Sequence, residues 1–313
     1  MTFSGARHAL IIQNPTSGRR RARRERDIAE ALRSLREAGI AIDAVITEAR
    51  GHATELARSA VDNFDMVIAC GGDGTINEIA NGLAHSQTPL AILPAGTANV
   101  FAKELEIPWD IPAAARLIPS AIHRRIALGA VDFTSTNRAQ GAVRYFLSVA
   151  GAGPDGELVR KVRDGLKYYT GTGAYWWEGL RQLFLYRFPG FSISGGGESR
   201  EARLLVVGRT KSYGGPFRIT TEANLFEDMF EMMATNSTNP LRYFGWLLPL
   251  FMERLRGYPG IEYWKGAEAL CEPLFADKPV YAQVDGEPIG PLPLRFRVAP
   301  DALTICVPAA ETA

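Results

Sequence analysis

The sequence predicts an α/β protein of two domains, with an N-terminal, open, mostly parallel α/β sheet and a C-terminal β-rich sandwich. Over residues 1–124, apolar runs of strand length alternate four times with amphipathic helical patterns, which is typical of a parallel sheet covered on both faces. Over residues 125–298, short β-rich runs separated by Gly and Pro favour an antiparallel sandwich or barrel, and we predict the sandwich. The length of 313 residues is sufficient for both domains.

Composition and charge limit the classes of function. Apolar residues make up 46% and charged residues 22% of the chain, as in a globular protein, and a net charge of +1 argues against a surface devoted to nucleic acid. Cysteines and histidines are scattered singly, so we expect buried thiols in a reducing compartment and no metal site built from these residue types. They are Cys70, Cys271, Cys306, His8, His52, His85 and His123.

The chain is expected to be soluble or peripheral to a membrane. Its first apolar run is too short for a signal peptide. The densest apolar segment, residues 246–252, is far shorter than a membrane span and contains Pro249.

The first two strands and helices have clear limits. Residues 8–13 (HALIIQ) read as a buried strand that ends at NPTSG, residues 14–18, a turn rich in residues that hydrogen-bond locally. A helix follows and ends at Gly39. Residues 40–46 form the second strand, followed by Thr47 and a second helix. The inner faces of the two helices consist of Ile28, Ala31, Leu32 and Leu35, and of Ala53, Leu56, Ala57 and Ala60.

The third strand runs directly into a glycine turn, in the stretch MVIACGGDGTINEIANGL at residues 66–83. Helical spacing resumes at once, at Ile76, Ile79, Ala80 and Leu83. Gly71, Gly72 and Gly74 allow backbone N–H groups at a helix N-terminus to approach a phosphate. An ordinary strand-to-helix loop is the alternative, and the acid at Asp73 favours the phosphate site, where it would meet Mg²⁺ or orient the donor.

A fourth strand, residues 89–93, ends at PAGTAN, residues 94–99, and helices are predicted from about Val100 and over residues 112–118. Three loops, NPTSG, GGDGT and PAGTAN, therefore follow strands of one parallel sheet. Ligands of open α/β sheets bind at the carboxyl ends of the strands. We expect a ligand site where the three loops meet.

Arginines crowd the start of the first helix, at Arg19, Arg20, Arg21, Arg23, Arg24 and Arg26. Cations at a helix N-terminus oppose the helix dipole, so a bound anion would relieve the mismatch. A solvated basic face and a patch for polyphosphate or anionic head groups are both compatible with this pattern.

The second domain combines short strands with two aromatic-rich insertions. The predicted strands are residues 126–133, 143–150, 201–209, 229–235, 261–264, 279–284 and 292–298, and Gly195 to Gly197 is a predicted hairpin tip. The insertions are residues 168–186 and 240–255. Their aromatic side chains either pack the core of this domain or form an entrance that touches a bilayer or an acyl chain.

Several common enzyme motifs are absent from the sequence, which limits the reactions that it can be expected to catalyse. The sequence has no P-loop motif, the GGDGT spacing differs from that of a dinucleotide Rossmann turn, and no common hydrolase signature occurs. A late acidic pair, Asp285 and Glu287, ends a predicted strand. Phosphoryl transfer to an alcohol needs a carboxylate to accept the hydroxyl proton, and Asp285 is our candidate, supported by Glu287. A type I′ hairpin turn at Asp285-Gly286 is the structural alternative.

With NPTSG, GGDGTINEIANGL and LPAGTAN in this order, the chain resembles the diacylglycerol kinase catalytic-domain superfamily, which includes bacterial soluble lipid kinases and the sphingosine and ceramide kinases. The resemblance covers nearly the whole chain, because the family has a β-rich second domain with a late DGE. GGDGT alone is shared with NAD kinases and 6-phosphofructokinases. The resemblance also implies that residues 299–313 rejoin the first domain.

The resemblance implies an ATP site in the cleft between the domains, with Asp285 as the proton acceptor and Glu287 beside it. The positions that match nucleotide-binding residues of the family are Asn14, Pro15, Thr16, Ser17, Gly18, Thr47, Gly72, Asp73, Gly74, Thr75, Asn77, Glu78 and Thr97. It further implies a structural Mg²⁺ with Asn224, Glu227 and Met229 as ligands and Asp132 behind them, and Asp228 is the alternative to Glu227 as the acid of this site. Relatives usually have an Asp-Gly pair at this segment, and here no glycine follows the acid.

We therefore expect an ATP- and Mg²⁺-dependent lipid kinase that acts on a hydroxyl of a lipid such as diacylglycerol. The protein is expected in the cytoplasm, in peripheral contact with the inner face of the membrane, with no nucleic-acid partner and with a homodimer among the open oligomeric states. An NAD kinase or other small-alcohol kinase is one alternative. A non-catalytic nucleotide- or lipid-binding protein of the same fold is the other, favoured by the altered metal segment.

Overall fold

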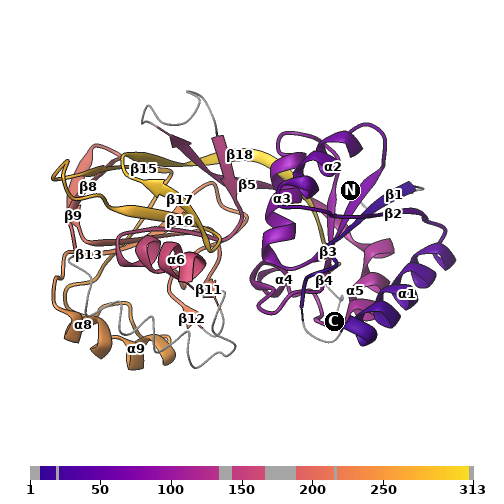
Figure 1. The fold of residues 1–313 in the computed structure, drawn as a ribbon, viewed down its shortest axis with the longest axis horizontal. Coiled ribbons are helices and arrows are strands. Elements are labelled where there is room, and N and C mark those ends of the chain that lie inside the picture. The colour runs from indigo at the N-terminus through magenta and orange to yellow at the C-terminus, as the bar shows by residue number, and fades with distance from the viewer. Residues whose placement is uncertain (1–7, 19–20, 134–142, 166–187, 215–216, 310–313) are drawn as a thin grey trace. The chain divides into compact units, whose positions relative to one another are not determined.

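The computed structural model describes residues 8–18, 21–133, 143–165, 188–214 and 217–309. The chain forms two compact units (Figure 1). Unit 1 contains residues 1–128 and 299–313, and unit 2 contains residues 129–298. The strands β5 (Ile122–Phe133) and β18 (Leu294–Val307) each contain a boundary between the units.

Unit 1 is built on a parallel sheet, as its alternating pattern predicts. The strand order is β2-β1-β3-β4, and the end of β18 joins β4 through a parallel pairing of Ile305 with Leu90. The strands are β1 (His8–Gln13), β2 (Ala41–Ile46), β3 (Met66–Gly71) and β4 (Leu90–Pro94). Helices cover both faces of the sheet, so the prediction of an open α/β sheet is confirmed.

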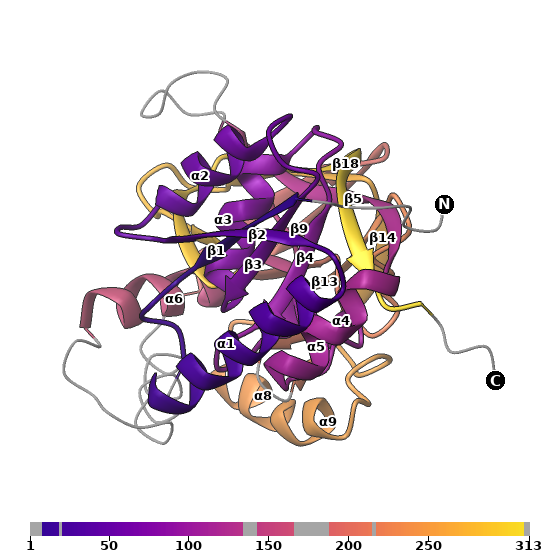
Figure 2. The same ribbon diagram turned by 90° about the vertical axis from the view of Figure 1, so that its right-hand side faces the viewer.

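The helices of unit 1 pack in two pairs (Figure 2). The helices α1 (Arg21–Glu37) and α5 (Ile111–Leu117) lie on one face, and α2 (His52–Ala60) and α3 (Asp73–Leu83) lie on the other. The predicted apolar face of α3 is fully buried. Gly82 lets α2 and α3 approach closely, because a Cβ there would lie 2.5 Å from the carbonyl oxygen of Thr54. Short α4 (Val100–Glu104) and a 3₁₀ turn (Ile118–Ser120) complete the unit.

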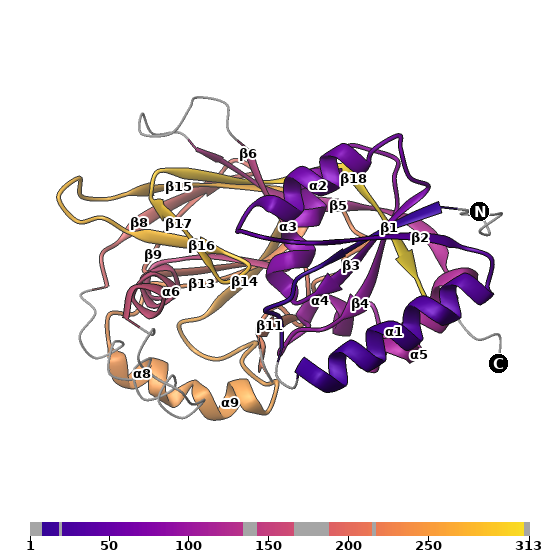
Figure 3. The ribbon, with the colours of Figure 1, turned by 45° about the vertical axis from the view of Figure 1, so that its right-hand side comes forward.

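Unit 2 is an antiparallel sandwich (Figure 3). Its six-stranded sheet has the order β14-β13-β10-β7-β16-β17. The members are β7 (Val149–Ala152), β10 (Leu204–Gly208), β13 (Phe230–Thr235), β14 (Glu262–Gly266), β16 (Tyr281–Val284) and β17 (Glu287–Pro291). The other layer contains β6 (Val143–Phe146), β8 (Phe191–Gly195), β9 (Glu198–Ala202) and β15 (Glu268–Pro273), with the unit 2 parts of β5 and β18. A small ribbon, β11 (Ser212–Gly214) with β12 (Phe217–Arg218), and α6 (Pro154–Gly165) complete the unit.

Several strands of unit 2 differ from the predicted ones. The predicted strand at residues 143–150 is divided into β6 and β7, because the backbone N–H groups at Leu147 and Ser148 bond to the side chain of Asp285. The predicted strand at residues 201–209 is likewise divided between β9 and β10. The strands β8, β15 and β17 were not predicted, because short runs with mixed polarity give no clear period of two. The predicted hairpin tip at Gly196-Gly197 is confirmed, since Gly195 pairs with Glu198.

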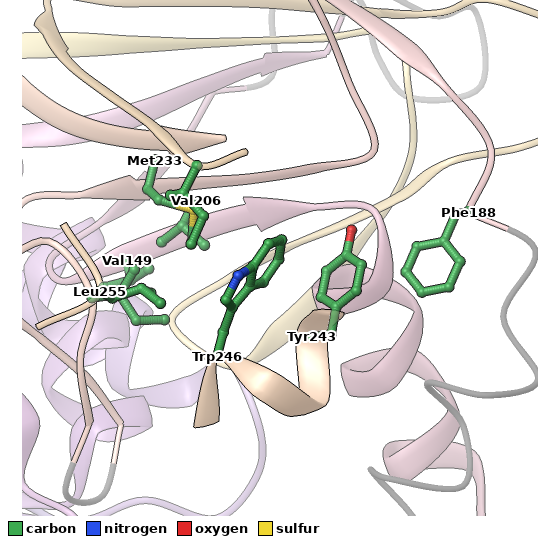
Figure 4. Close-up of a cluster of buried hydrophobic side chains, with 9 residues drawn as sticks. Val149, Phe188, Val206, Met233, Tyr243, Trp246 and Leu255 are labelled. Carbon is green, nitrogen blue, oxygen red and sulfur yellow. The ribbon is translucent and has the colours of Figure 1, made fainter. Parts of the chain in front are cut away.

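The insertion at residues 240–255 forms α8 (Pro240–Gly245) and α9 (Leu247–Phe251). Figure 4 shows that Tyr243 and Trp246 belong to a buried cluster with Val206 of β10 and Met233 of β13. These aromatic side chains are therefore core residues, as one of the two sequence interpretations predicts. The insertion at residues 168–186 lies outside the described residues.

Candidate active site

Three loops of unit 1 lie against one another at the carboxyl ends of β1, β3 and β4. Gly18 has φ +72°, and a Cβ there would lie 2.5 Å from the carbonyl oxygen of Ala95. A Cβ on Gly96 would lie 2.5 Å from the Cα of Gly72. The backbones of NPTSG, GGDGT and PAGTAN are thus in contact, at distances that only glycine permits.

Side chains join the first loop to the second. The Asn14 Nδ2 donates to Thr75 Oγ1 at 3.0 Å, and the N–H of Gly72 donates to Ser17 Oγ at 3.4 Å. The Oδ1 of Asn14 in turn accepts from the N–H and the hydroxyl of Thr16, at 2.9 and 2.8 Å. The polar residues of NPTSG therefore shape the loops, which is why short polar side chains are needed there.

Asp73 joins the second loop to the third. Its Oδ1 accepts the N–H of Phe101 at 3.2 Å, at the start of α4. Burial raises the pKa of this carboxyl, and the N–H groups around Phe101 act in the opposite direction. A carboxylate at a helix N-terminus is a favourable pair. Asp73 thus holds α4 and the PAGTAN loop to the start of α3.

The first turn of α3 is open to a ligand. The first N–H groups of a helix have no acceptor within the helix, and they favour anions. Gly74 in this turn is exposed, and a Cβ there would meet no atom within 4 Å. An exposed glycine and the polarity of a helix N-terminus together fit a phosphate group.

Arg24 brings a positive charge to the same edge of the sheet. Its Nη2 donates to the carbonyl oxygen of Pro15 at 2.5 Å. Burial raises the pKa of the Cys70 thiol at the end of β3 to about 12, and the charge of Arg24 opposes this rise. The sequence indicated a basic helix start without distinguishing Arg24 from its neighbours. The neighbouring Arg23 instead pairs with Asp27 at 3.7 Å, while Arg19 and Arg20 lie outside the described residues.

The remaining predicted nucleotide residues lie around these loops. The N–H of Thr47 donates to the carbonyl oxygen of Gln13, at 2.8 Å, which places Thr47 beside the end of β1. Glu78 Oε1 accepts the N–H of Gly51 at 2.9 Å, so this carboxylate caps α2. Asn77 is buried against Asn81, and Thr97 is exposed at the end of β4. Asn77 and Glu78 therefore have structural partners in unit 1.

In unit 2, Asp285 and Gly286 form the two-residue tip between β16 and β17, with φ 46° and 77°. This is the hairpin turn that the Asp-Gly pair predicts. The carboxylate of Asp285 is nevertheless engaged: Oδ2 accepts the N–H of Leu147 at 2.8 Å, and Oδ1 accepts those of Ser148 and Val149 at 2.9 Å each. The same residue therefore forms the hairpin turn and carries the anchored carboxylate. Asp285 is only partly buried, so it remains accessible.

Glu287 begins β17, and its carboxylate accepts a hydrogen bond from Arg144 of β6. Both side chains are partly buried, which strengthens a charge pair relative to one in water. The pairing fixes the strand that follows the Asp285 turn. Arg144 was not singled out in the sequence, because an arginine on a short strand has no distinguishing pattern.

A buried polar network connects the turn to the interior of unit 2. Gln283 Oε1 accepts the N–H of Gly286 at 2.8 Å, and its Nε2 donates to Asp155 Oδ2 at 2.8 Å. The other oxygen of Asp155 accepts the hydroxyl of Tyr213. Burial raises the pKa of Asp155 to about 6, against a lowering by Gln283. Asp155 and Gln283 were not predicted as site residues.

The predicted metal segment surrounds an arginine. The backbone carbonyl groups of Glu227 and Met229 accept hydrogen bonds from Arg209, at 2.5 and 2.8 Å. The Glu227 carboxylate accepts from Lys265 Nζ at 2.8 Å and from Asn224 Nδ2 at 3.2 Å. Asp132, predicted to stand behind the metal, forms a two-bond pair with Arg297 at 2.8 and 3.2 Å. No group of three or more His, Cys, Asp or Glu residues in the described part of the chain could hold a metal ion.

The cysteines are buried, as predicted, and free. Burial raises the thiol pKa of Cys271 and of Cys306 as well. In the part of the chain that the structure describes, no helix is long and apolar enough to cross a membrane.

Both units match families of known proteins. Residues 8–131 match the family described as the diacylglycerol kinase catalytic domain, and residues 148–307 match the YegS C-terminal NAD kinase beta sandwich-like domain. The chain is 35% identical to a diacylglycerol kinase of Bacillus subtilis, over 74% of this chain and 75% of the relative. It is 32% identical to a diacylglycerol kinase of Staphylococcus aureus, over 93% and 89%. A crystal structure described as a diacylglycerol kinase of Bacillus anthracis has the same fold, with TM-score 0.73, 19% identity and 98% of each chain covered.

Proposed function

Because the chain belongs to the diacylglycerol kinase family, a family of kinases that use ATP, we propose that it transfers the γ-phosphoryl group of ATP to the hydroxyl of a lipid such as diacylglycerol. In this proposal unit 1 is the nucleotide-binding domain and unit 2 is the lipid-substrate domain. The observation that carries it is the anchored carboxylate of Asp285, partly accessible at a rigid turn. That the two halves meet in a cleft stays a prediction.

The donor half of the proposal rests on the contacting loops of unit 1. The N–H groups at the start of α3 would bind phosphate oxygen atoms, and Arg24 would add a positive charge beside NPTSG. Asp73 would act through α4, whose N-terminus it already holds. Mg²⁺, when bound with the triphosphate, would neutralise part of its charge.

For the acceptor half, Asp285 is proposed as the general base. In the transfer, the lipid hydroxyl gives its proton to the carboxylate while its oxygen forms a bond to the γ-phosphorus, and the bond from that phosphorus to the β–γ bridging oxygen breaks to leave ADP. Backbone N–H groups hold both oxygen atoms of this carboxylate in place, Oδ2 through Leu147 and Oδ1 through Ser148 and Val149.

We propose α8 and α9 as the surface that meets the membrane. Four apolar side chains of these helices have large exposed fractions: Leu241 (66%), Phe244 (51%), Leu248 (68%) and Phe251 (61%). Arg242 and Arg254 are exposed on the same segment, and no ion pair involves them within the described residues. Exposed apolar side chains beside free arginines suit an anionic lipid surface, where both kinds of contact contribute.

The second candidate is phosphoryl transfer to NAD or to another soluble alcohol, which is favoured by the match of unit 2 to an NAD kinase-like sandwich. It would need no apolar entrance, so the exposed face of α8 and α9 would have no role. A non-catalytic binding protein of this fold would use the donor loops alone.

An assay with labelled ATP tests these functions together. The acceptors are detergent-dispersed diacylglycerol, phosphatidylglycerol and sphingoid bases, with NAD as the soluble acceptor. We expect phosphorylation of a lipid. Transfer to NAD with none to any lipid would overturn the proposal in favour of the second candidate, and binding of ATP without transfer to any acceptor would favour the non-catalytic one.

A further inference from the structure

Arg209 lies in the interior of unit 2, directly after β10, with an exposed fraction of 0%. A buried guanidinium is costly unless hydrogen bonds replace its water. Here Nη1 donates to the carbonyl oxygen atoms of Glu227 and Met229, and Nη2 donates to that of Leu225 at 2.7 Å. Three backbone oxygen atoms of one loop therefore face one positive charge.

The side chains of Asn224 and Glu227 in the same loop are occupied by other partners. Asn224 Oδ1 accepts the N–H of Phe226 at 3.0 Å, which closes the loop, and its amide nitrogen bonds to the Glu227 carboxylate. That carboxylate also pairs with Lys265 at the surface. Both anions of the predicted metal network, Glu227 and Asp132, thus form ion pairs with basic side chains of this chain.

We propose that the guanidinium of Arg209 takes the place of a metal ion in the loop at residues 224–229, so that the chain supplies its own cation there and orders the loop without a divalent ion. Carbonyl oxygen atoms that converge on one point are typical ligands of a hard cation. Mg²⁺ demands near-octahedral oxygen coordination and would have to share these three carbonyls with a fixed positive charge. The donor set fits a planar, multi-donor guanidinium instead.

The backbone at Arg209 also contacts the segment that anchors the candidate base. The N–H groups of Arg209 and Thr210 donate to the carbonyl oxygen of Ser148, at 2.8 and 3.3 Å. The N–H of Ser148 donates to Asp285 Oδ1. The loop before β13, held by the side chain of Arg209, is therefore adjacent along this strand end to the segment that anchors Asp285.

Thermal unfolding of the full chain without nucleotide tests the proposal directly. The melting temperature is compared in excess EDTA and in excess Mg²⁺, and the metal content of the purified protein is measured by mass spectrometry. We expect the same melting temperature in both conditions and no stoichiometric divalent metal. A melting temperature that falls in EDTA and recovers with Mg²⁺ would overturn the proposal.

Three variants test the role of the charge. Arg209→Met removes it, Arg209→Lys keeps it with fewer donors, and Arg254→Met removes an exposed arginine as the matched control. We expect the melting temperature to be lowest for R209M, intermediate for R209K and unchanged for R254M. The proposal fails if the melting temperature of R209M equals that of the wild type, or if R209K is no more stable than R209M. If neither Arg209 variant folds, the chelation experiment on the wild type decides alone.

Discussion

Gln283 donates a 2.8 Å hydrogen bond to the buried carboxylate of Asp155, 128 positions away in the sequence. The same side chain accepts the N–H of Gly286 in the turn that carries Asp285. One amide group therefore connects an interior acid to the candidate base. The position of Asp285 depends on both ends of this connection, because a buried amide that loses either partner leaves a polar group unsatisfied.

Asp155 predicts a measurable pH dependence of stability. Burial raises its pKa from 3.8 unfolded to about 6 folded, so the stabilising contribution of the protonated form is complete below 3.8 and is lost as the pH rises through 6. Over that window the wild type should lose about 3 kcal/mol of unfolding free energy from this group alone. The variant Asp155→Asn has no carboxyl group at this position, so it does not lose this contribution as the pH rises.

Urea unfolding of wild type and D155N at about pH 4 and about pH 8 measures the difference. We expect the stability deficit of D155N to be smaller at the higher pH by about 3 kcal/mol. Glu201→Gln, on exposed β9, is the control and should show the same deficit at both pH values. A deficit for D155N that is independent of pH would show that Asp155 stays ionised throughout.

Asp285→Asn tests the proposed base. An amide keeps an acceptor for one side of the N–H cluster but places an NH₂ group against the other, so some stability is lost together with the base. We expect kcat to fall roughly 10²–10⁴-fold while the Kd for ATP, bound on unit 1, stays the same. Isothermal titration with ATP and the lipid kinase assay measure the two quantities.

Asp301→Asn is a matched control for this variant, because Asp301 also has a positive φ, 50°, and its carboxylate also accepts a hydrogen bond, from Arg125. It should retain kcat. If D285N turns over at a rate near that of the wild type, another group accepts the proton and the assignment of the base is wrong.

The fold was predictable where burial imposes a period. The strands β3 and β4 are continuous apolar runs, and the face of α3 repeats at helical spacing, so these elements follow from the residues themselves. The contact of the three loops also follows, since carboxyl ends of parallel strands share one edge. The Asp285-Gly286 turn was predictable for the same local reason, from its residue types.

The supporting partners were not predictable, because their signals are not local. Arg209 is the last residue of the predicted strand at residues 201–209, where nothing in its neighbours marks a charged side chain as buried, yet it is fully buried. Asp155 looks like an ordinary acid in the first turn of a helix. Each acquires its role from carbonyl, amide or hydroxyl groups far along the chain, which only the folded structure brings together.

Arg24 and Arg23 form a matched pair for the donor site. Arg24 bonds to the NPTSG loop, whereas its neighbour on α1 pairs with Asp27 within the helix. We expect Arg24→Met to raise the Kd for ATP roughly tenfold, through loss of a charged hydrogen bond and of a nearby positive charge. Arg23→Met should leave it unchanged. Equal effects of the two variants, measured by titration with ATP, would mean that the basic helix start acts as a general field and that Arg24 has no special place in it.

The last prediction concerns the exposed face of α8 and α9. Tyr243 and Trp246 hold these helices to the core (Figure 4), whereas Leu248 of α9 is exposed. Leu248→Glu should weaken binding to vesicles of anionic phospholipid roughly tenfold, since one buried leucine contributes about 1.5–3 kcal/mol. Activity on a short-chain, monomeric lipid should persist, because the variant leaves Asp285 and the donor loops intact. Phe275→Glu alters an exposed aromatic residue elsewhere on unit 2 and should bind vesicles as the wild type does. Vesicle sedimentation separates the outcomes: equal losses for both variants would indicate non-specific apolar binding, and no loss for L248E would remove α9 from the membrane contact.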